Sequence, residues 1–302
     1  MYKSNINLNL YKTFYEVAKY GSISETAKQT YTSQPAISKA IKNLENELNV
    51  KLFYRDLNGV SLTEKGRELL YFVEESYNNL IIAERNMIET ENLNRGKLSI
   101  GMPSNVGTFY LLDKIIDFHN EYPNIEITIV TGSTNQLLSL LESHKVDFII
   151  DTSPINTKMD AVIKEVKTVE YCFIVKKDST IKNINKIKSL KDLKDKPLIL
   201  PISGTANRKN LDIIFESNNI EVSNVINIHT SEMIISAVKK DLGIGYIIKD
   251  LVFSDIENDN LMVIDVKEKL PTVAINLIYL KKYLTKAPIY FINKYIGEKI
   301  KY

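Results

Sequence analysis

The sequence predicts an α/β protein whose amino-terminal region is mainly helical, and three observations lead to this prediction. Apolar residues recur at helical spacing in three short runs over residues 8–48. A stretch without proline, residues 64–92, keeps a 3–4 spacing of apolar residues and predicts one long helix. From residue 98 onward, short apolar runs alternate with helical patterns, which indicates a parallel sheet with helices on both faces.

Composition is typical of a globular protein that can bury a core. The 302 residues are 44% hydrophobic and include 39 Lys+Arg, 37 Asp+Glu and one cysteine. No uncharged apolar run approaches the ~20 residues that cross a bilayer, and the first residues lack the apolar core of a signal peptide. We therefore expect a cytoplasmic protein with no membrane partner. The lone Cys172 lies between aromatic residues and is interpreted as a core residue.

Positive charge is concentrated at the amino terminus. Residues 1–65 carry nine Lys/Arg and six Asp/Glu, a formal charge of +3, whereas the remainder carries −1. A surplus of this size also arises by chance on a solvated surface. Its sign is the one that a phosphate-binding domain requires.

Residues 8–48 predict a helix-turn-helix. The first helix ends at Gly21, the second is capped by Ser22 or Ser24, and Ser33 caps a third helix that tolerates Pro35 in its first turn. One face of the third helix is apolar and predicts the core: Ile37, Ala40, Ile41, Leu44 and Leu48. The opposite face is small, polar and basic, which suits the second helix of a DNA-binding pair.

A wing and a long helix follow the third helix. Residues 51–62 predict two short strands around an Asn58-Gly59 turn, and Thr63 can cap the long helix. A narrow apolar stripe runs along this helix: Leu70, Val73, Tyr77, Leu80 and Met87. Because the stripe is narrow, we interpret it as packing against a second helix, in a dimer, rather than on its own domain.

The α/β region places polar loops where strands meet helices. Predicted strands are 98–101, 125–130, 146–150, 171–175, 198–200, 225–229, 244–248, 261–264 and 273–279, and the last helix covers 288–299. Four of the loops bear hydroxyl or amide side chains: Ser104 and Asn105; Thr131, Ser133 and Thr134; Ser203 and Thr205; Thr230 and Ser231. Each loop taken alone is explained by helix capping. Together they suit a small polar or anionic ligand at helix amino termini.

The amino-terminal motifs resemble those of the LysR-type transcriptional regulators. The matching blocks are Phe14–Ala27, Ser33–Ser38, Leu44-Glu45, Leu52–Arg55 and Leu62–Gly66, in the family's order and spacing. Thr26, Tyr31 and Asn49 depart from the family's usual Ala, Leu and Gly, and we expect the first two exchanges to repack the helix contact. Looser similarity at residues 98–101, 118–123 and 145–150 extends the resemblance over nearly the full length.

This resemblance implies three domains. They are a winged helix-turn-helix (1–65), a dimerising linker helix (66–94) and a two-lobed effector domain similar to periplasmic binding proteins (95–302). Lobe I would hold 97–166 and 270–302, and lobe II 168–268, with crossings near 166–169 and 267–272. The family's effector binds between the lobes, which makes the four polar loops its expected site. Arg208 and Lys209 could counter a carboxylate there, or be surface charges.

The resemblance also implies a DNA face and partners. Gln34 is expected at a base edge, Ser38 and Lys39 at bases or phosphate, and Lys42 at phosphate, with Ser33 and Pro35 shaping the helix start. Arg55 in the wing is expected to contact the DNA backbone or minor groove, and a salt bridge with Asp56 or Glu64 is its alternative. We expect inverted-repeat promoter DNA, a homodimer or homotetramer, a small-molecule effector and a possible contact with RNA polymerase.

Catalysis is not indicated. The three histidines are scattered without metal-ligand spacing, and no dinucleotide, phosphate-loop or nucleophile-elbow motif occurs. We predict no enzyme activity, no metal and no cofactor. Two alternatives remain, a solute-binding transport protein of the same two-lobed fold and an enzyme fused to a DNA-binding domain. The effector, the target genes and the choice between activation and repression are not determined by the sequence.

Overall fold

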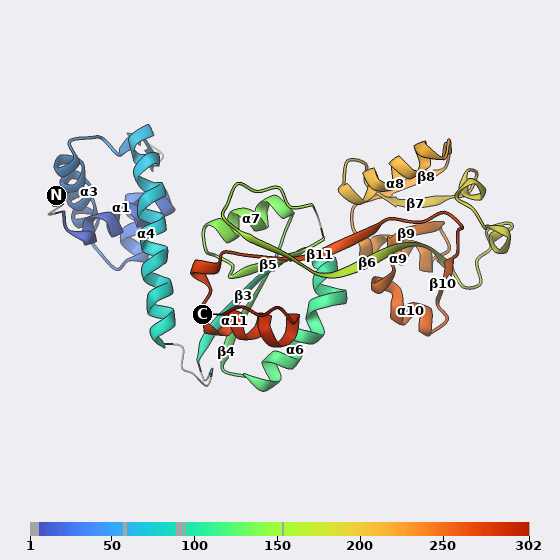
Figure 1. Ribbon diagram of the computed structural model, residues 1–302. Helices are drawn as coiled ribbons and strands as arrows, with labels where there is room; N and C mark the ends of the chain where they lie inside the picture. Colours follow the sequence, from blue (N-terminus) through green and yellow to red (C-terminus); the bar gives the residue numbers. More distant parts are fainter. Residues whose placement is uncertain (1–5, 57–58, 89–92, 94, 153, 302) are drawn as a thin grey trace. The chain divides into compact units, whose positions relative to one another are not determined.

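The protein divides into two compact units, residues 1–87 and residues 88–302 (Figure 1). The computed structural model describes residues 6–56, 59–88, 93, 95–152 and 154–301. No helix among these residues has the length and apolar character needed to cross a membrane.

The first unit has the winged helix-turn-helix that the sequence predicts. Its elements are α1 (Leu8–Tyr20), α2 (Ile23–Gln29), α3 (Gln34–Leu48), β1 (Phe53–Asp56), β2 (Gly59–Leu62) and α4 (Glu64–Ile88). The capping predictions are confirmed, because Gly21 is left-handed after α1 and Ser22 and Ser33 accept backbone N–H groups at the starts of α2 and α3. The predicted end of the long helix, residues 89–92, lies outside the described residues.

One apolar core holds this unit together. Phe14 and Val17 of α1 meet Ile41 and Leu44 of α3, and all four side chains are at most 1% exposed. Phe53 of the wing packs on Phe14 with ring centroids 5.3 Å apart. The core therefore joins all three short helices to the wing, and the opposite face of α3 is left to solvent.

The second unit alternates strands and helices over its whole length. Its strands are β3 (Gly96–Met102), β4 (Ile125–Thr131), β5 (Phe148–Asp151), β6 (Val162–Lys176), β7 (Leu198–Pro201), β8 (Val225–Ile228), β9 (Ile244–Ile248), β10 (Leu261–Ile264) and β11 (Thr272–Tyr279). Its longer helices are α6 (Leu112–Glu121), α7 (Thr134–Glu142), α8 (Ala206–Ser217), α9 (Ser231–Lys239), α10 (Phe253–Glu257) and α11 (Lys286–Phe291).

Two helices differ from the prediction. Residues 102–107 were expected to be a loop, but the chain turns helical at Ser104 through α5 (Ser104–Val106) and η1 (Gly107–Leu111) into α6. The buried Val106 and Leu111 explain this, because they continue the apolar face of the helix toward the sheet. The last helix begins earlier than expected, at α11, and ends at Ile296, where Gly297 is left-handed.

The nine strands of this unit form one hydrogen-bonded sheet, in the order β4-β3-β5-β11-β6-β9-β7-β8, with β10 beside β6. Pairs β3–β4, β3–β5, β7–β8 and β7–β9 are parallel, whereas β6 and β11 are antiparallel to their neighbours. The expectation of a purely parallel sheet is therefore wrong at its centre. There the chain passes twice between the two halves, once in each direction.

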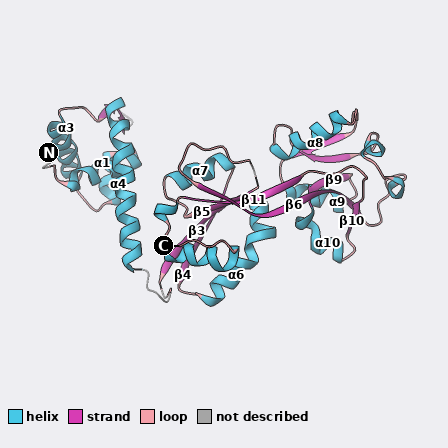
Figure 2. Cartoon of the chain, viewed as in Figure 1, coloured by secondary structure: helices cyan, strands magenta, loops and turns pink. Residues whose placement is uncertain are grey.

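We call the β3–β5 half lobe I and the β7–β10 half lobe II; β6 and β11 pass between them (Figure 2). The ladder between β6 and β11 shifts register between Ile275 and Asn276, which leaves Val166 without an opposite residue. Such a bulge bends a strand locally. The bulge lies in the predicted first crossing, residues 166–169. The predicted second crossing, residues 267–272, lies almost entirely before β11, which begins at Thr272.

Candidate nucleic-acid interface and ligand loops

The start of α3 presents the predicted DNA-contacting side chains to solvent. Ser33 caps the helix by accepting from the Ala36 N–H at 3.4 Å, and Pro35 lies in the first turn. Gln34, Lys39 and Lys42 are exposed, and Ser38 is half-buried. Small residues at this end allow a close approach to a base edge. The site residues predicted on α3 thus lie on one accessible helix face.

A buried carboxylate on the other side of α3 fixes the wing. Glu45 is 6% exposed and accepts the Leu52 N–H at 2.9 Å and the Phe53 N–H at 3.4 Å through Oε1. Its Oε2 accepts from Lys51 Nζ at 2.8 Å. Burial raises the pKa of Glu45, but the hydrogen bonds from Lys51, Leu52 and Phe53 outweigh burial and lower it. The carboxylate therefore remains charged near neutral pH.

Thr63 and Gly66 attach α4 to the same strand entrance. Thr63 Oγ1 donates to the Lys51 carbonyl at 2.7 Å and accepts the Gly66 N–H at 2.9 Å. A Cβ on Gly66 would lie 2.1 Å from the Leu52 carbonyl oxygen, so any other residue forces the backbone apart. Thr63 was expected to cap the long helix, and its contact with the Gly66 N–H confirms this. The resemblance had matched Glu45 and Gly66 without giving them a role, and the structure shows that both are structural.

The tip of the wing contacts the turn between α1 and α2. Val60 donates to the Gly21 carbonyl at 3.0 Å, and a Cβ on Gly59 would lie 2.5 Å from that oxygen. Gly59 pairs with Asp56 within the strands, and Asn58 of the predicted Asn58-Gly59 turn lies outside the described residues. Arg55 pairs with Val60 through its backbone, and its side chain lies outside the described residues.

Tyr31 does not repack the helix contact, contrary to the sequence prediction. Its side chain is 99% exposed, and its backbone is left-handed with φ of 53°. Thr26 does lie in that contact, because it is fully buried and donates Oγ1 to the Ser22 carbonyl at 2.7 Å. Asn49, where the family commonly has Gly, is left-handed at the end of α3, a conformation that Asn tolerates.

The apolar stripe of α4 serves two surfaces. Val73 is 9% exposed within the first unit's core, Leu70 packs on that core, and the Tyr77 ring lies 5.2 Å from that of Tyr15. The expectation that the stripe does not lie on its own domain is wrong for these three residues, because Val73 and Leu70 pack with the core of the first unit and Tyr77 packs on Tyr15 of α1. Leu80 and Met87, farther along the helix, are 56% and 84% exposed.

Strand register brings the polar loops together in two pairs. In lobe I, β3 and β4 are parallel and end opposite each other at Met102 and Thr131, so Ser104 and Ser133 follow at one edge. In lobe II, β7 and β8 end together at Pro201 and Ile228, followed by the loops of Thr205 and Thr230. A contact between η1 of lobe I and η4 (Lys249–Val252) of lobe II lies just beyond the first loop.

Several of these polar side chains cap helices. Ser133 forms a capping box with Gln136 on α7, Thr205 accepts the Arg208 N–H at 3.4 Å, and Thr230 accepts the Met233 N–H at 3.4 Å. Thr134 Oγ1 donates to the buried Asp151 at 2.8 Å. The Asn105 side chain accepts the Val106 N–H at 2.9 Å. The capping alternative accounts for the contacts of Ser133, Thr205 and Thr230, whereas Thr134 and Asn105 make other local hydrogen bonds.

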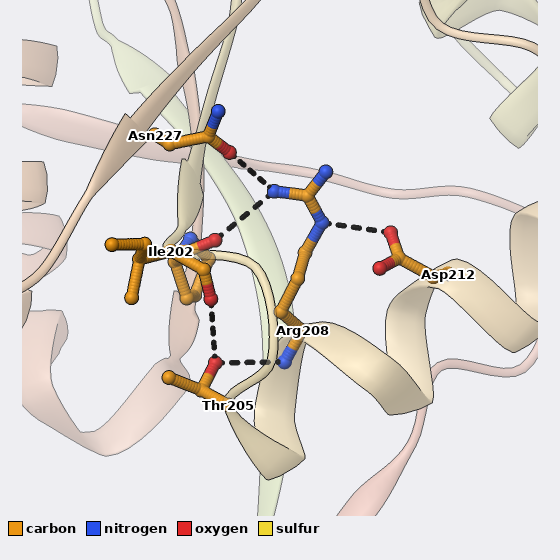
Figure 3. Close-up of polar contacts among 6 residues, drawn as sticks. Ile202, Thr205, Arg208, Asp212 and Asn227 are labelled. Atoms are coloured by element: carbon orange, nitrogen blue, oxygen red, sulfur yellow. Dashed lines mark hydrogen bonds and ion pairs between the residues drawn. The ribbon is translucent and has the colours of Figure 1, made fainter.

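Arg208 ties the loop after β7 to α8 (Figure 3). Its Nε lies 2.7 Å from Asp212, and Nη1 donates to the Pro201 carbonyl at 3.0 Å and to Asn227 Oδ1 at 2.5 Å. The side chain is only 11% exposed. Arg208 is thus a paired, largely buried cation, and the interpretation of Arg208 as an exposed surface charge is wrong.

Comparisons with known proteins agree with this arrangement. Residues 8–67 match the model of the bacterial regulatory helix-turn-helix proteins of the lysR family, and residues 91–291 match the LysR substrate binding domain. The HTH-type transcriptional regulator YoaU of Bacillus subtilis is 31% identical over 245 residues, 80% of this chain and 82% of YoaU. YofA of Bacillus velezensis is 25% identical over 268 residues, 89% and 90% of the two chains.

Two solved structures share the fold. A full-length OxyR variant from Pseudomonas aeruginosa superposes with a TM-score of 0.70 at 19% identity, covering 97% of this chain and 95% of that one. Full-length CbnR in complex with its target DNA gives 0.56 at 16% identity, covering 96% and 98%.

We expect Glu45→Gln to lower the free energy of opening of the wing by about 1.5–3 kcal/mol at pH 7, which is the contribution of a hydrogen bond to a charged group. Because its folded pKa is lowered, the carboxylate stabilises the fold fully above its unfolded pKa near 4.5, and this stabilisation is lost as pH falls through the folded value. Hydrogen exchange of the Leu52 and Phe53 amides measures this directly. Glu47→Gln, an exposed position on the same helix, is the control, and equal exchange in both variants contradicts the prediction.

Proposed function

Since this chain belongs to the LysR family and is a DNA-binding transcriptional regulator with an effector domain, we propose that a small polar or anionic metabolite bound between its lobes controls its binding to promoter DNA. The observation that carries the proposal is strand register. It places two polar loops at one edge of each lobe, and η1 and η4 bring the lobes into contact beside one of them.

The DNA side of the proposal rests on the exposed start of α3. Gln34 reads a base edge in the major groove, Ser38 and Lys39 contact bases or phosphate, and Lys42 contacts phosphate one turn later. Ser33 and Pro35 set the helix start, and Arg55 of the wing reaches the backbone or minor groove. The division into domains 1–65, 66–94 and 95–302 belongs to the same proposal.

Gln34→Ala and Lys42→Ala should differ in what they change. Losing the base contact of Gln34 reduces the difference in binding free energy between specific and random DNA by ~1–3 kcal/mol. Losing the phosphate contact of Lys42 weakens binding to all sequences and lowers the slope of log affinity against log salt by about 0.9. Binding is measured by fluorescence anisotropy at several salt concentrations, on a duplex selected from a random library by the full-length protein. If Gln34→Ala weakens both DNAs equally, the base-edge assignment is wrong.

Hydroxyls without a capping role are the stronger effector candidates. Ser104, Thr131 and Ser203 are exposed at the strand ends, beside loops whose caps are Ser133, Thr205 and Thr230. Asn105 and Ser231 complete the proposed site. Exposed helix N–H groups favour an anion without a full cation, which matters because Arg208 is already paired. A ligand that binds the closed lobes better shifts the population toward that state.

Ser104→Ala and Thr131→Ala should each weaken effector binding about tenfold, the equivalent of ~1.4 kcal/mol, and abolish the effector's influence on DNA binding. Basal DNA binding should persist, because the first unit is untouched. A metabolite identified by thermal-shift screening is titrated calorimetrically into each variant. Ser139→Ala, on the exposed face of α7, is the control, and unchanged affinity in both loop variants contradicts the site.

Assembly follows from the exposed part of α4. Leu80 and Met87 present apolar surface beyond the first unit's core, and we propose that a second copy of α4 covers it in a homodimer or homotetramer. A symmetric dimer requires an inverted-repeat site. Contact with RNA polymerase also remains a prediction from the family resemblance.

Replacing Leu80 and Met87 together with Glu should yield monomers at micromolar concentration that no longer bind the inverted repeat specifically. Charged side chains on both helices would repel each other and lose the apolar contact. Sedimentation velocity measures the assembly state, with Ser76→Glu, at an exposed position outside the stripe, as the control. A monomeric wild type would refute the dimer.

A further inference from the structure

A second basic segment lies far along the chain from the helix-turn-helix. Residues 176–196, which we call the basic segment, contain eight lysines and three aspartates, a formal charge of +5. Residues 1–65 carry +3, and the whole chain +2, so everything else together carries −6. Residues 281–301 carry a further +5, so positive charge is concentrated in three segments, and only the first has been assigned a partner.

The lysines of the basic segment are available to a partner. Lys182, Lys186, Lys188, Lys191 and Lys194 are exposed. Within the described part of the chain none of the five forms an ion pair, whereas Lys177 pairs with Asp259 at 2.8 Å. Four of the five lie within nine consecutive residues, 186–194. Because the fields of closely spaced, unpaired positive charges add, the segment is a region of high positive potential.

Nearby carboxylates are engaged with the backbone instead. Asp192 accepts the Lys188 and Ser189 N–H groups at 2.9 and 3.0 Å, and Glu268 accepts the Ser189 hydroxyl at 2.6 Å and the Leu190 N–H at 2.9 Å. The pKa of Asp192 is lowered, first by the Lys188 N–H, with Lys196 and Lys267 contributing. These acids hold the segment in place and offset only part of its charge.

The basic segment is a fixed part of lobe II. It connects β6 to β7 through two short turns, η2 (Ile184–Lys186) and η3 (Leu190–Leu193), drawn in yellow at the right of Figure 1. Ile187, Leu190 and Leu193 are at most 3% exposed in the core. With these residues as anchors, the lysines are presented on a preorganised surface, which reduces the entropic cost of binding.

We propose that the basic segment binds the phosphate backbone of duplex DNA that flanks the site held by the helix-turn-helix. Sequence-independent lysine–phosphate contacts need only charge and proximity. DNA is the polyanion that this protein already holds through its first unit, so flanking duplex is presented to lobe II at a high effective concentration. The α4 helix, about 38 Å long at 1.5 Å per residue, is comparable to one turn of DNA.

The experiment compares two duplexes that share the library-selected site, one ending at its edges and one extended by about 20 base pairs of random sequence on each side. The full-length wild type should bind the long duplex more tightly and with a steeper salt slope. If three phosphates are contacted, the slopes differ by about 2.7, so a fourfold rise in salt removes about 40-fold of the advantage.

The variant Lys186→Gln, Lys188→Gln, Lys191→Gln, Lys194→Gln should bind the short duplex like wild type and lose the advantage on the long one. A matched variant with Gln at the exposed lobe I and carboxyl-terminal residues Lys145, Lys281, Lys299 and Lys301 should keep the advantage. The proposal is overturned if the wild type binds both duplexes equally well, or if the matched variant loses as much of the long-duplex advantage as the first variant does. It is also overturned if the first variant keeps the advantage, which is the result expected if the segment binds an acidic protein instead of DNA. Failure of the α3 assignment is separate, because it affects the short duplex.

Discussion

Glu45 and the backbone groups that it accepts form the contact on which the DNA-binding unit depends. The carboxylate projects from the buried side of α3, and its partners are the N–H groups of Leu52 and Phe53 at the start of the wing. Removing a buried carboxylate from one side of such a contact leaves donors unpaired, which is more costly than the bond itself is worth. Thr63 and Gly66 connect the same strand entrance to α4. Helix, wing and linker thus share one junction, and the position of α3 relative to the wing follows from it.

In the second unit the corresponding constraint is the ladder between β6 and β11. These two strands connect the lobes, so a change in the angle between the lobes must bend β6 and β11. The bulge at Val166 is the point where regular pairing is interrupted. In the proposed effector response, a ligand draws the polar edges of the two lobes together, and this bulge is where the ladder bends.

Polar groups in this protein commonly hold the backbone rather than face a partner. Arg208, Asp192 and Glu268 are all charged, yet each is engaged in fixing a loop or turn. The ligand contacts that we propose use other described residues: the exposed face of α3, the hydroxyls without a capping role at the strand ends and the lysines of the basic segment. A charged residue at the right position in a sequence is therefore a weak indicator of a site until its partners are known.

The sequence by itself determined the local elements and the family. Helix boundaries at Gly21 and Ser33, the buried stripe of α3 and most strands followed from periodicity and capping, which depend on near neighbours. Only the tertiary structure decided the surroundings of side chains whose neighbours are distant in the sequence. Val73 on the linker stripe is buried in the core of the first unit, Tyr31 is left exposed, and Arg208 is paired with Asp212 and Asn227. The direction of β6 and β11 was also beyond the sequence, because strand pairing joins residues about a hundred positions apart and local patterns carry no record of it.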